Sequence, residues 1–187
     1  MRWAASVPDN FRFSVKAPRT VTHEHRLKGH GAVLDSFFEE VSGLGEKLGV
    51  LLVQLPPSLA YDADTAEAFF RDLARAQTAV ACEPRHASWF TPGADNLMKS
   101  LHIARVAADP PRAARDRVPG GDTRWGYFRL HGSPKIYHSK YSDAALAGLA
   151  QTLRSGDWCI FDNTAASYAL GNALDLHRRT ALQLIIR

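Results

Sequence analysis

Ionisable and amide side chains recur at the carboxyl ends of the predicted strands in this sequence. They are Lys16, Gln54, Glu83 with Arg85 and His86, Asp109, Arg129 with His131, and Asp162–Asn163. The carboxyl ends of parallel strands meet at one edge of a sheet, and α/β proteins bind their ligands there. A partly desolvated cluster of both charge signs is costly unless it holds a ligand or an internal network. We therefore expect a binding or catalytic site at this edge.

The residue types suggest distinct roles in such a site. Lys16, Arg85 and Arg129 would bind the negative charge of a small anionic or sugar-like ligand. The candidate catalytic residues are Glu83, His131 and Asp109. Glu83 or His131 would move a proton, because burial and neighbouring charges can tune their pKa values. Asp109 and Asn163 would orient hydroxyl groups, although alternation alone does not decide whether Asp162 or Asn163 points inward.

Each of these residues also has a purely structural explanation. Lys16 can extend to solvent, Glu83 can pair with Arg85 or Arg129, His131 can be a turn residue before Gly132, and Gln54 can cap a strand end by hydrogen bonding. Three hypotheses about the function of the protein therefore stay open. The first is an enzyme of hydrolysis or isomerisation, since neither reaction requires an evident cofactor motif. The others are a non-catalytic module for a phosphate, nucleotide or nucleic-acid ligand, and an inactive truncated barrel.

No metal site is predicted, and the sequence does not name a cofactor. His23–Glu24–His25, with His30 nearby, forms an HxH pattern in a predicted loop, and this pattern is weak by itself. Glu83, Asp109 and His131 could supply oxygen and nitrogen ligands to a divalent ion. No diagnostic spacing joins these three residues.

The composition is that of a globular, cytoplasmic chain. Its 187 residues are 45% hydrophobic and 22% charged, with a net charge of +4 that permits an anionic ligand. The positive charges are scattered, which disfavours nucleic acid as a partner but leaves it open. Cys82 and Cys159 lie in apolar runs without a CxxC partner, a pattern typical of a reducing compartment. No apolar run reaches the roughly 18 residues of a membrane span, and the start lacks a signal-peptide core.

Apolar periodicity predicts six strands that alternate with helices in one domain, residues 1–187. The strands cover 11–17, 50–57, 78–86, 103–111, 126–132 and 158–163. The helices cover 33–48, 64–76, 93–102, 142–157 and 166–186, with a loop at 112–124. Asp64 and Glu67 are predicted to form a capping box, and Ser142 and Gly156 to start and stop the fifth helix.

This order predicts a parallel sheet, either open or closed into a barrel. No GxGxxG or GxxxxGK[ST] motif supports a nucleotide-binding open sheet. The strands alternate in polarity, which favours a barrel with polar residues turned inward. In the run 127–131, Phe128 and Leu130 would face the helices, while Arg129 and His131 face the barrel interior. A complete barrel usually needs about 250 residues, so an incomplete one is expected.

Five segments in order resemble the hallmark segments of the YecE-like family, catalogued as domain of unknown function 72. They are FSVKAPRTVTHEHRL, KLGVLLVQLPPS, CEPRHASWF, YFRLHG and FDNTAASYALGNALDL. The resemblance covers essentially the whole chain and implies a TIM-type barrel whose activity is not established. The description of relatives as related to sugar isomerases is an analogy of fold and does not define chemistry.

The family pattern marks residues that largely coincide with the strand ends. They are Lys16, Arg19, His23, Gln54, Pro56–Pro57, Glu83, Arg85, His86, Ser88, Trp89, Arg129, His131, Gly132, Asn163, Gly171, Asn172 and Ala173. Of these, Lys16, Arg19, His23, Gln54, Arg85, His86, Trp89, Arg129 and Asn163 form the candidate ligand-binding set.

Two features depart from the family pattern. Pro84 stands where relatives carry an aromatic or aliphatic residue, so the third strand is expected to end or bulge early. The two opening strands of the family have no counterpart here. We therefore expect a barrel with six of eight strands, whose open edge could support self-association.

Overall fold

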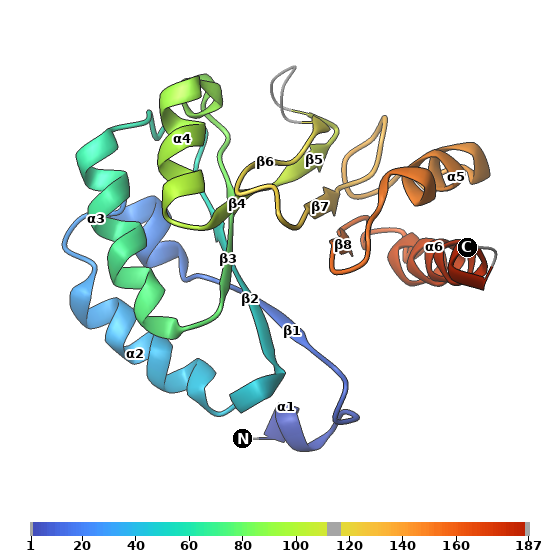
Figure 1. Ribbon diagram of the computed structural model, residues 1–187, viewed down its shortest axis with the longest axis horizontal. Helices are drawn as coiled ribbons and strands as arrows, with labels where there is room; N and C mark the ends of the chain where they lie inside the picture. Colours follow the sequence, from blue (N-terminus) through green and yellow to red (C-terminus); the bar gives the residue numbers. More distant parts are fainter. Residues whose placement is uncertain (1, 112–116, 186–187) are drawn as a thin grey trace. The chain divides into compact units, whose positions relative to one another are not determined.

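The computed structural model describes residues 2–111 and 117–185, which form eight β-strands and six α-helices (Figure 1). Two compact units divide these residues. Unit 1 comprises the described residues of Met1–Arg105 with Gly120–Asp122, and unit 2 comprises those of Val106–Pro119 with Thr123–Arg187.

Unit 1 is a five-stranded sheet in the order β1-β2-β3-β4-β6. Its strands are β1 (Phe13–Lys16), β2 (Leu48–Gln54), β3 (Ala79–Glu83), β4 (Ile103–Arg105) and β6 (Gly120–Gly121). Its helices are α1 (Arg2–Ala5), α2 (Gly31–Ser42), α3 (Ala63–Leu73) and α4 (Pro92–Ser100), with shorter turns at Thr20–Glu24, Gly45–Lys47, Ala74–Ala76 and Ala87–Phe90. The first four strands are parallel, and β6 is antiparallel to β4.

Two helices of unit 1, α3 and α4, begin where a polar side chain accepts a hydrogen bond from a free backbone N–H. The Asp62 carboxylate caps α3 by accepting from the Thr65 N–H, and the Thr91 hydroxyl caps α4. The predicted capping box of Asp64 and Glu67 is therefore wrong. Glu67 instead pairs with Arg71, one helical turn later on the exposed face.

The parallel register of unit 1 places polar residues on one face of its sheet. Lys16 lies opposite Leu52, and Gln54 lies opposite Glu83. Because paired residues point to the same side of a sheet, Lys16, Gln54 and Glu83 share a face at its carboxyl edge. Arg105 lies on the opposite face, where it pairs with Asp95 of α4 at 2.9 Å. That second face is the one covered by helices, which lie along one side of the strands in Figure 1.

Unit 2 is a three-stranded parallel sheet in the order β5-β7-β8. Its elements are β5 (Ala107–Asp109), β7 (Tyr127–Leu130), α5 (Asp143–Thr152), β8 (Trp158–Phe161) and α6 (Tyr168–Ile185). Ser142 caps α5 as predicted, but the helix ends at Thr152, before the predicted stop at Gly156.

Alternation in β7 is confirmed by the packing. Leu130 joins Tyr141, Leu146, Ala150 and Leu176 in a core formed with α5 and α6, and Phe161 of β8 packs against it. Arg129 therefore points to the face away from these helices.

The main difference from the predicted elements lies between residues 103 and 121. The single strand predicted over 103–111 divides at Val106 into β4 and β5, which belong to different sheets. In the predicted loop 112–124, residues 112–116 lie outside the described part, and Gly120–Gly121 forms β6. A Cβ at Gly120 would lie 2.1 Å from an Arg105 side-chain nitrogen, so glycine permits this pairing beside the buried guanidinium.

Candidate functional site

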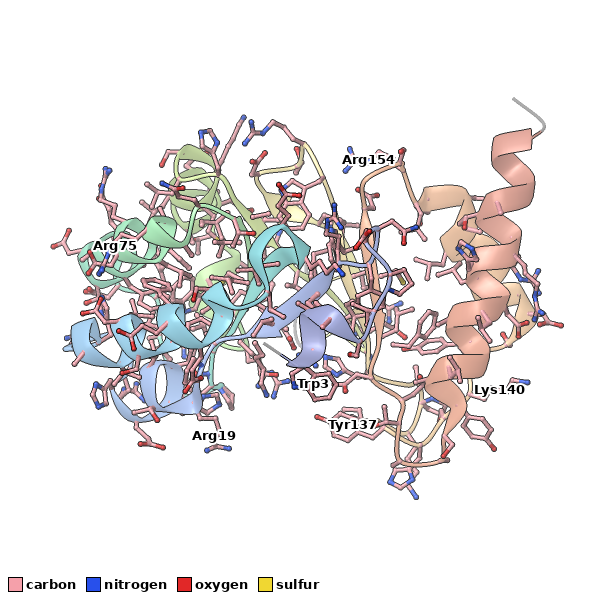
Figure 2. The ribbon with its side chains drawn as sticks, turned by 90° about the horizontal axis from the view of Figure 1, so that it is seen from below. Trp3, Arg19, Arg75, Tyr137, Lys140 and Arg154 are labelled. Carbon is pink, nitrogen blue, oxygen red and sulfur yellow. The ribbon has the colours of Figure 1, made fainter. Side chains whose placement is uncertain are left out.

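Four basic residues gather at the carboxyl edge of unit 1, and we call them the cationic cluster: Lys16, Arg19, His23 and Arg85. β1 ends at Lys16, and the turn that follows carries Arg19 and His23. Arg19 points outward from this turn in Figure 2. Lys16 and Arg19 are exposed, and neither side chain forms an ion pair or hydrogen bond with another described residue. Two positive charges therefore face solvent beside a third, on Arg85.

The pKa of His23 reflects the positive charge of this cluster. Burial and the positive charges of Arg19, Arg85 and Lys16 lower the pKa of His23 from its ordinary value of 6.5, while Glu24 opposes the shift. Like charges disfavour the protonated ring, because each added positive charge raises its energy. The His23 ring is also held by a 2.8 Å hydrogen bond between its Nδ1 and the Thr22 hydroxyl.

Glu83 is the buried carboxylate beside the cationic cluster. It is 2% exposed, and its Oε1 accepts a 3.2 Å hydrogen bond from Arg85. β3 ends at Glu83, directly before Pro84, as the substituted proline predicted. The Arg85 Nε is buried and has no hydrogen-bond partner among the described residues. One nitrogen of the Arg85 guanidinium thus pairs with Glu83, while its Nε–H has no acceptor among the described residues.

Two loops at this edge are held together by three contacts. The Trp89 indole N–H donates to the Leu59 carbonyl at 2.9 Å, and the Tyr61 N–H donates to the Ser88 hydroxyl at 2.7 Å. The Tyr61 and Trp89 rings meet edge to face with centroids 5.0 Å apart. Trp89, predicted as a ligand-binding residue, is only 1% exposed and anchors the loops from within.

Unit 2 carries a second group of charges at its strand ends, which we call the paired cluster: Arg129, His131 and Asp162. The same Oδ2 of Asp162 accepts from an Arg129 nitrogen at 2.6 Å and lies 3.0 Å from Nδ1 of His131. Arg129 and His131 are 8% and 6% exposed. Asp162 therefore neutralises Arg129 and orients the His131 ring in an almost buried setting.

Asp109 and Asn163 occupy the other face of this sheet. Asp109 lies opposite Leu130, on the helix side, and accepts a 2.8 Å hydrogen bond from the Tyr141 hydroxyl. Burial and this hydrogen bond raise the pKa of Tyr141. Asn163 is fully buried and donates to the Ser139 carbonyl and to Asn172. Asp109 and Asn163 thus belong to a network beneath α5 and α6, away from the face that carries Arg129.

The predicted set is therefore distributed over three places. The edge of unit 1 gathers Lys16, Arg19, His23, Gln54, Glu83, Arg85 and His86. One face of unit 2 carries Arg129 and His131, and the other carries Asp109 and Asn163. The sequence reasoning left open whether Asp162 or Asn163 points inward and placed only Asn163 in the candidate set. The β7–β8 register brings Asp162, not Asn163, to the face of Arg129 and His131. The sequence reasoning also missed Tyr141, for which the sequence pattern offered no signal.

Among the described residues, no group of three His, Cys, Asp or Glu side chains is placed to hold a metal ion. The same part of the chain contains no helix that is both long and apolar enough to span a membrane. Cys82 and Cys159 are both free thiols, and burial raises the pKa of Cys159 to about 12.

The family model described as "Protein of unknown function DUF72" matches residues 1–185. The chain belongs to this family. The resemblance drawn from the five sequence segments is thereby confirmed, and no activity comes with DUF72 membership.

The chain is also similar to UPF0759 protein YecE from two strains of Escherichia coli. The K12 protein is 30% identical over 122 residues, and the O157:H7 protein is 29% identical over the same length. Each match covers 62% of this chain and 45% of the relative, so the alignment spans less than half of the relative's length.

Solved structures of DUF72 proteins share the fold. A protein from Thermotoga maritima MSB8 superposes with a TM-score of 0.76 at 22% identity, covering 97% of this chain and 77% of its own. A protein from Enterococcus faecalis V583 gives 0.77 at 21% identity, covering 96% and 78%. The fold class is thus mixed α/β with mostly parallel strands, as predicted.

Proposed function

We propose that this chain binds a small anionic ligand, such as a phosphorylated or carboxylated sugar, at the cationic cluster of unit 1. The observation that carries the proposal is the accumulation of Lys16, Arg19 and Arg85 around His23, where two of the cations have no ion pair within the described chain. Clustered cations repel one another, and an anion placed among them would relieve that repulsion.

The surroundings of the cluster favour a specific site over a merely basic surface. Arg85 is held in place by Glu83, and its side chain is only 15% exposed. The loops after β2 and β3 are joined through Ser88 and Trp89, so little ordering remains to be done when a ligand binds. A preorganised donor set binds more tightly than a flexible one because less conformational entropy is lost.

We further propose that the chain is an enzyme in which Glu83 transfers a proton during hydrolysis or isomerisation of that ligand. Support comes from its burial at the strand end beside Arg85, a setting in which carboxylates serve as acids or bases. The alternative is a binding module without catalysis. Glu83→Gln distinguishes the two, since it would abolish turnover in an enzyme but preserve or strengthen anion binding in a module.

We infer an incomplete TIM-type barrel in a single domain, supported by the strand–helix alternation and the similarity to DUF72 structures. We propose a cytoplasmic location, supported by the two free thiols. Self-association through an open strand edge is a further proposal, supported by β1 and β8 each pairing with a single strand among those described.

The ligand proposal is tested by titrating the purified chain with inorganic phosphate, with sulfate in parallel, and following backbone amide shifts by NMR. We expect saturable shifts around residues 16–23 and 83–86. Lys16→Gln and Arg19→Gln should each weaken phosphate binding roughly tenfold, because a charge-assisted hydrogen bond contributes about 1.5 kcal/mol.

The matched control is Lys99→Gln, in the last turn of α4 at the opposite ends of the strands. It removes the same charge from the chain and should leave phosphate affinity unchanged. Equal weakening by all three substitutions would reduce the effect to net charge and overturn the proposed site.

A further inference from the structure

His86 follows Arg85 directly at the end of β3, and two donors converge on one nitrogen of its ring. The Ser88 backbone N–H donates to His86 Nδ1 at 3.2 Å, and the Ser88 hydroxyl lies 2.8 Å from the same atom. A backbone N–H can only donate, so Nδ1 must be the accepting nitrogen. The ring hydrogen of neutral His86 therefore resides on Nε2.

Ser88 is itself oriented by the neighbouring loop. Its hydroxyl oxygen accepts from the Tyr61 N–H at 2.7 Å, which leaves the single hydroxyl hydrogen directed at His86. Tyr61 is in turn packed against the buried Trp89 ring. A chain of contacts thus runs from the loop after β2, through Ser88, to the tautomer of His86.

The other ring nitrogen of His86, Nε2, takes no part in these hydrogen bonds. His86 is half-buried, and the only hydrogen bonds of its ring to described residues are those with Ser88, at Nδ1. Its Nε2 therefore has no hydrogen-bond partner among the described residues. An N–H donor that is fixed in tautomer and has no partner among the described residues thus belongs to the residue that follows Arg85.

We infer that Ser88 is a positioning residue that holds His86 as an Nε2–H donor to an oxyanion oxygen of the ligand. This inference rests on the proposed anion site and deepens it. Lys16, Arg19 and Arg85 supply the charge, and His86 supplies one directional hydrogen bond. The ligand class is then a phosphate or carboxylate with an oxygen that accepts from a neutral donor.

The experiment has two readouts on the full chain. Long-range ¹H–¹⁵N NMR at a fixed neutral pH identifies which His86 nitrogen carries the hydrogen, and inorganic phosphate titration measures affinity. In the native chain we expect the Nε2–H tautomer alone. Ser88→Ala removes the shorter of the two contacts to Nδ1 and leaves only the 3.2 Å backbone N–H. A minor Nδ1–H population should then appear, and phosphate binding should weaken roughly fivefold because the Nε2–H donor is oriented less firmly. Ser88→Thr retains the hydroxyl and should restore both.

The control is Ser36→Ala on the exposed surface of α2, which should change neither readout. A native spectrum showing Nδ1–H would overturn the inference, as would a tautomer change in Ser88→Ala that leaves phosphate affinity intact. If the native chain binds no phosphate, the proposed function and the ligand contact of His86 both fail, while the spectrum still decides whether Ser88 sets the tautomer.

Discussion

The two strand-end clusters use similar residues in opposite ways. In the paired cluster of unit 2, one carboxylate serves Arg129 and His131, and both of these side chains are nearly buried. In the cationic cluster of unit 1, Glu83 pairs with Arg85, while Lys16 and Arg19 are exposed and have no ion pair within the described residues. The first cluster balances its charge internally. The second carries an excess of positive charge.

This difference suggests that one cluster stabilises the fold and the other binds a ligand. Buried charges must be neutralised within the protein, because the cost of leaving one unpaired is several kcal/mol. Exposed cations need no partner within the protein, because water solvates them until a ligand binds. The paired cluster is therefore expected to matter most for stability, and the cationic cluster most for binding.

The largest expected effect comes from Asp162→Asn. The substitution removes the negative charge that both Arg129 and His131 contact and leaves two nearly buried groups without it. We expect a loss of about 2 kcal/mol in the free energy of unfolding, below the full value for a buried pair because Asp162 is 31% exposed. Urea unfolding followed by circular dichroism measures this loss.

Asp143→Asn is the matched control for Asp162→Asn. Asp143 also pairs with an arginine, Arg179, but its side chain is 88% exposed. Exposed pairs contribute little, so the change should stay under about 0.5 kcal/mol. Equal effects of the two substitutions would show that Asp162 does not neutralise a buried group, and the contrast between the clusters would then fail.

A smaller effect is expected from Tyr141→Phe on the helix side of unit 2. The Tyr141 hydroxyl accepts from the Gly132 N–H and donates to Asp109, so phenylalanine leaves both without this partner. We expect a loss of about 1.5 kcal/mol in the free energy of unfolding, measured by urea unfolding. Tyr168→Phe, at a 41% exposed site, should be neutral. A neutral Tyr141→Phe would contradict the network described beneath α5 and α6.

The sequence predicted the strand ends better than the faces to which they point. Alternation placed Arg129 and Leu130 on opposite sides of β7, because a strand has a period of two. It could not decide between Asp162 and Asn163, since that choice depends on the register of β8 against β7. The register sets Arg129 opposite Ile160, which brings Asp162 to the side of Arg129 and His131 and turns Asn163 toward α6.

The break at Val106 illustrates a second limit of the sequence. A mostly apolar run over 103–111 predicted one strand, but the run supplies strands to two sheets. Asp109 then lies opposite Leu130 and meets Tyr141, a residue 32 positions later. Such long-range pairing leaves no local pattern in the sequence, so Asp109 was assigned to the same site as Glu83 and His131.

The smallest effect probes the cationic cluster itself, through the pKa of His23. Arg19→Gln removes the largest electrostatic cause that lowers this pKa, so the value should rise toward 6.5, as followed by NMR of the imidazole C–H signals. Arg71→Gln, on the exposed face of α3, should leave it unchanged.

Folded His23 holds its proton less tightly than unfolded His23, so the free energy of unfolding should decrease as pH falls through 6.5. Arg19→Gln should lessen that loss, and phosphate bound at the cluster should raise the same pKa. A pKa that responds to neither would mean that the cations around His23 do not act as one electrostatic site.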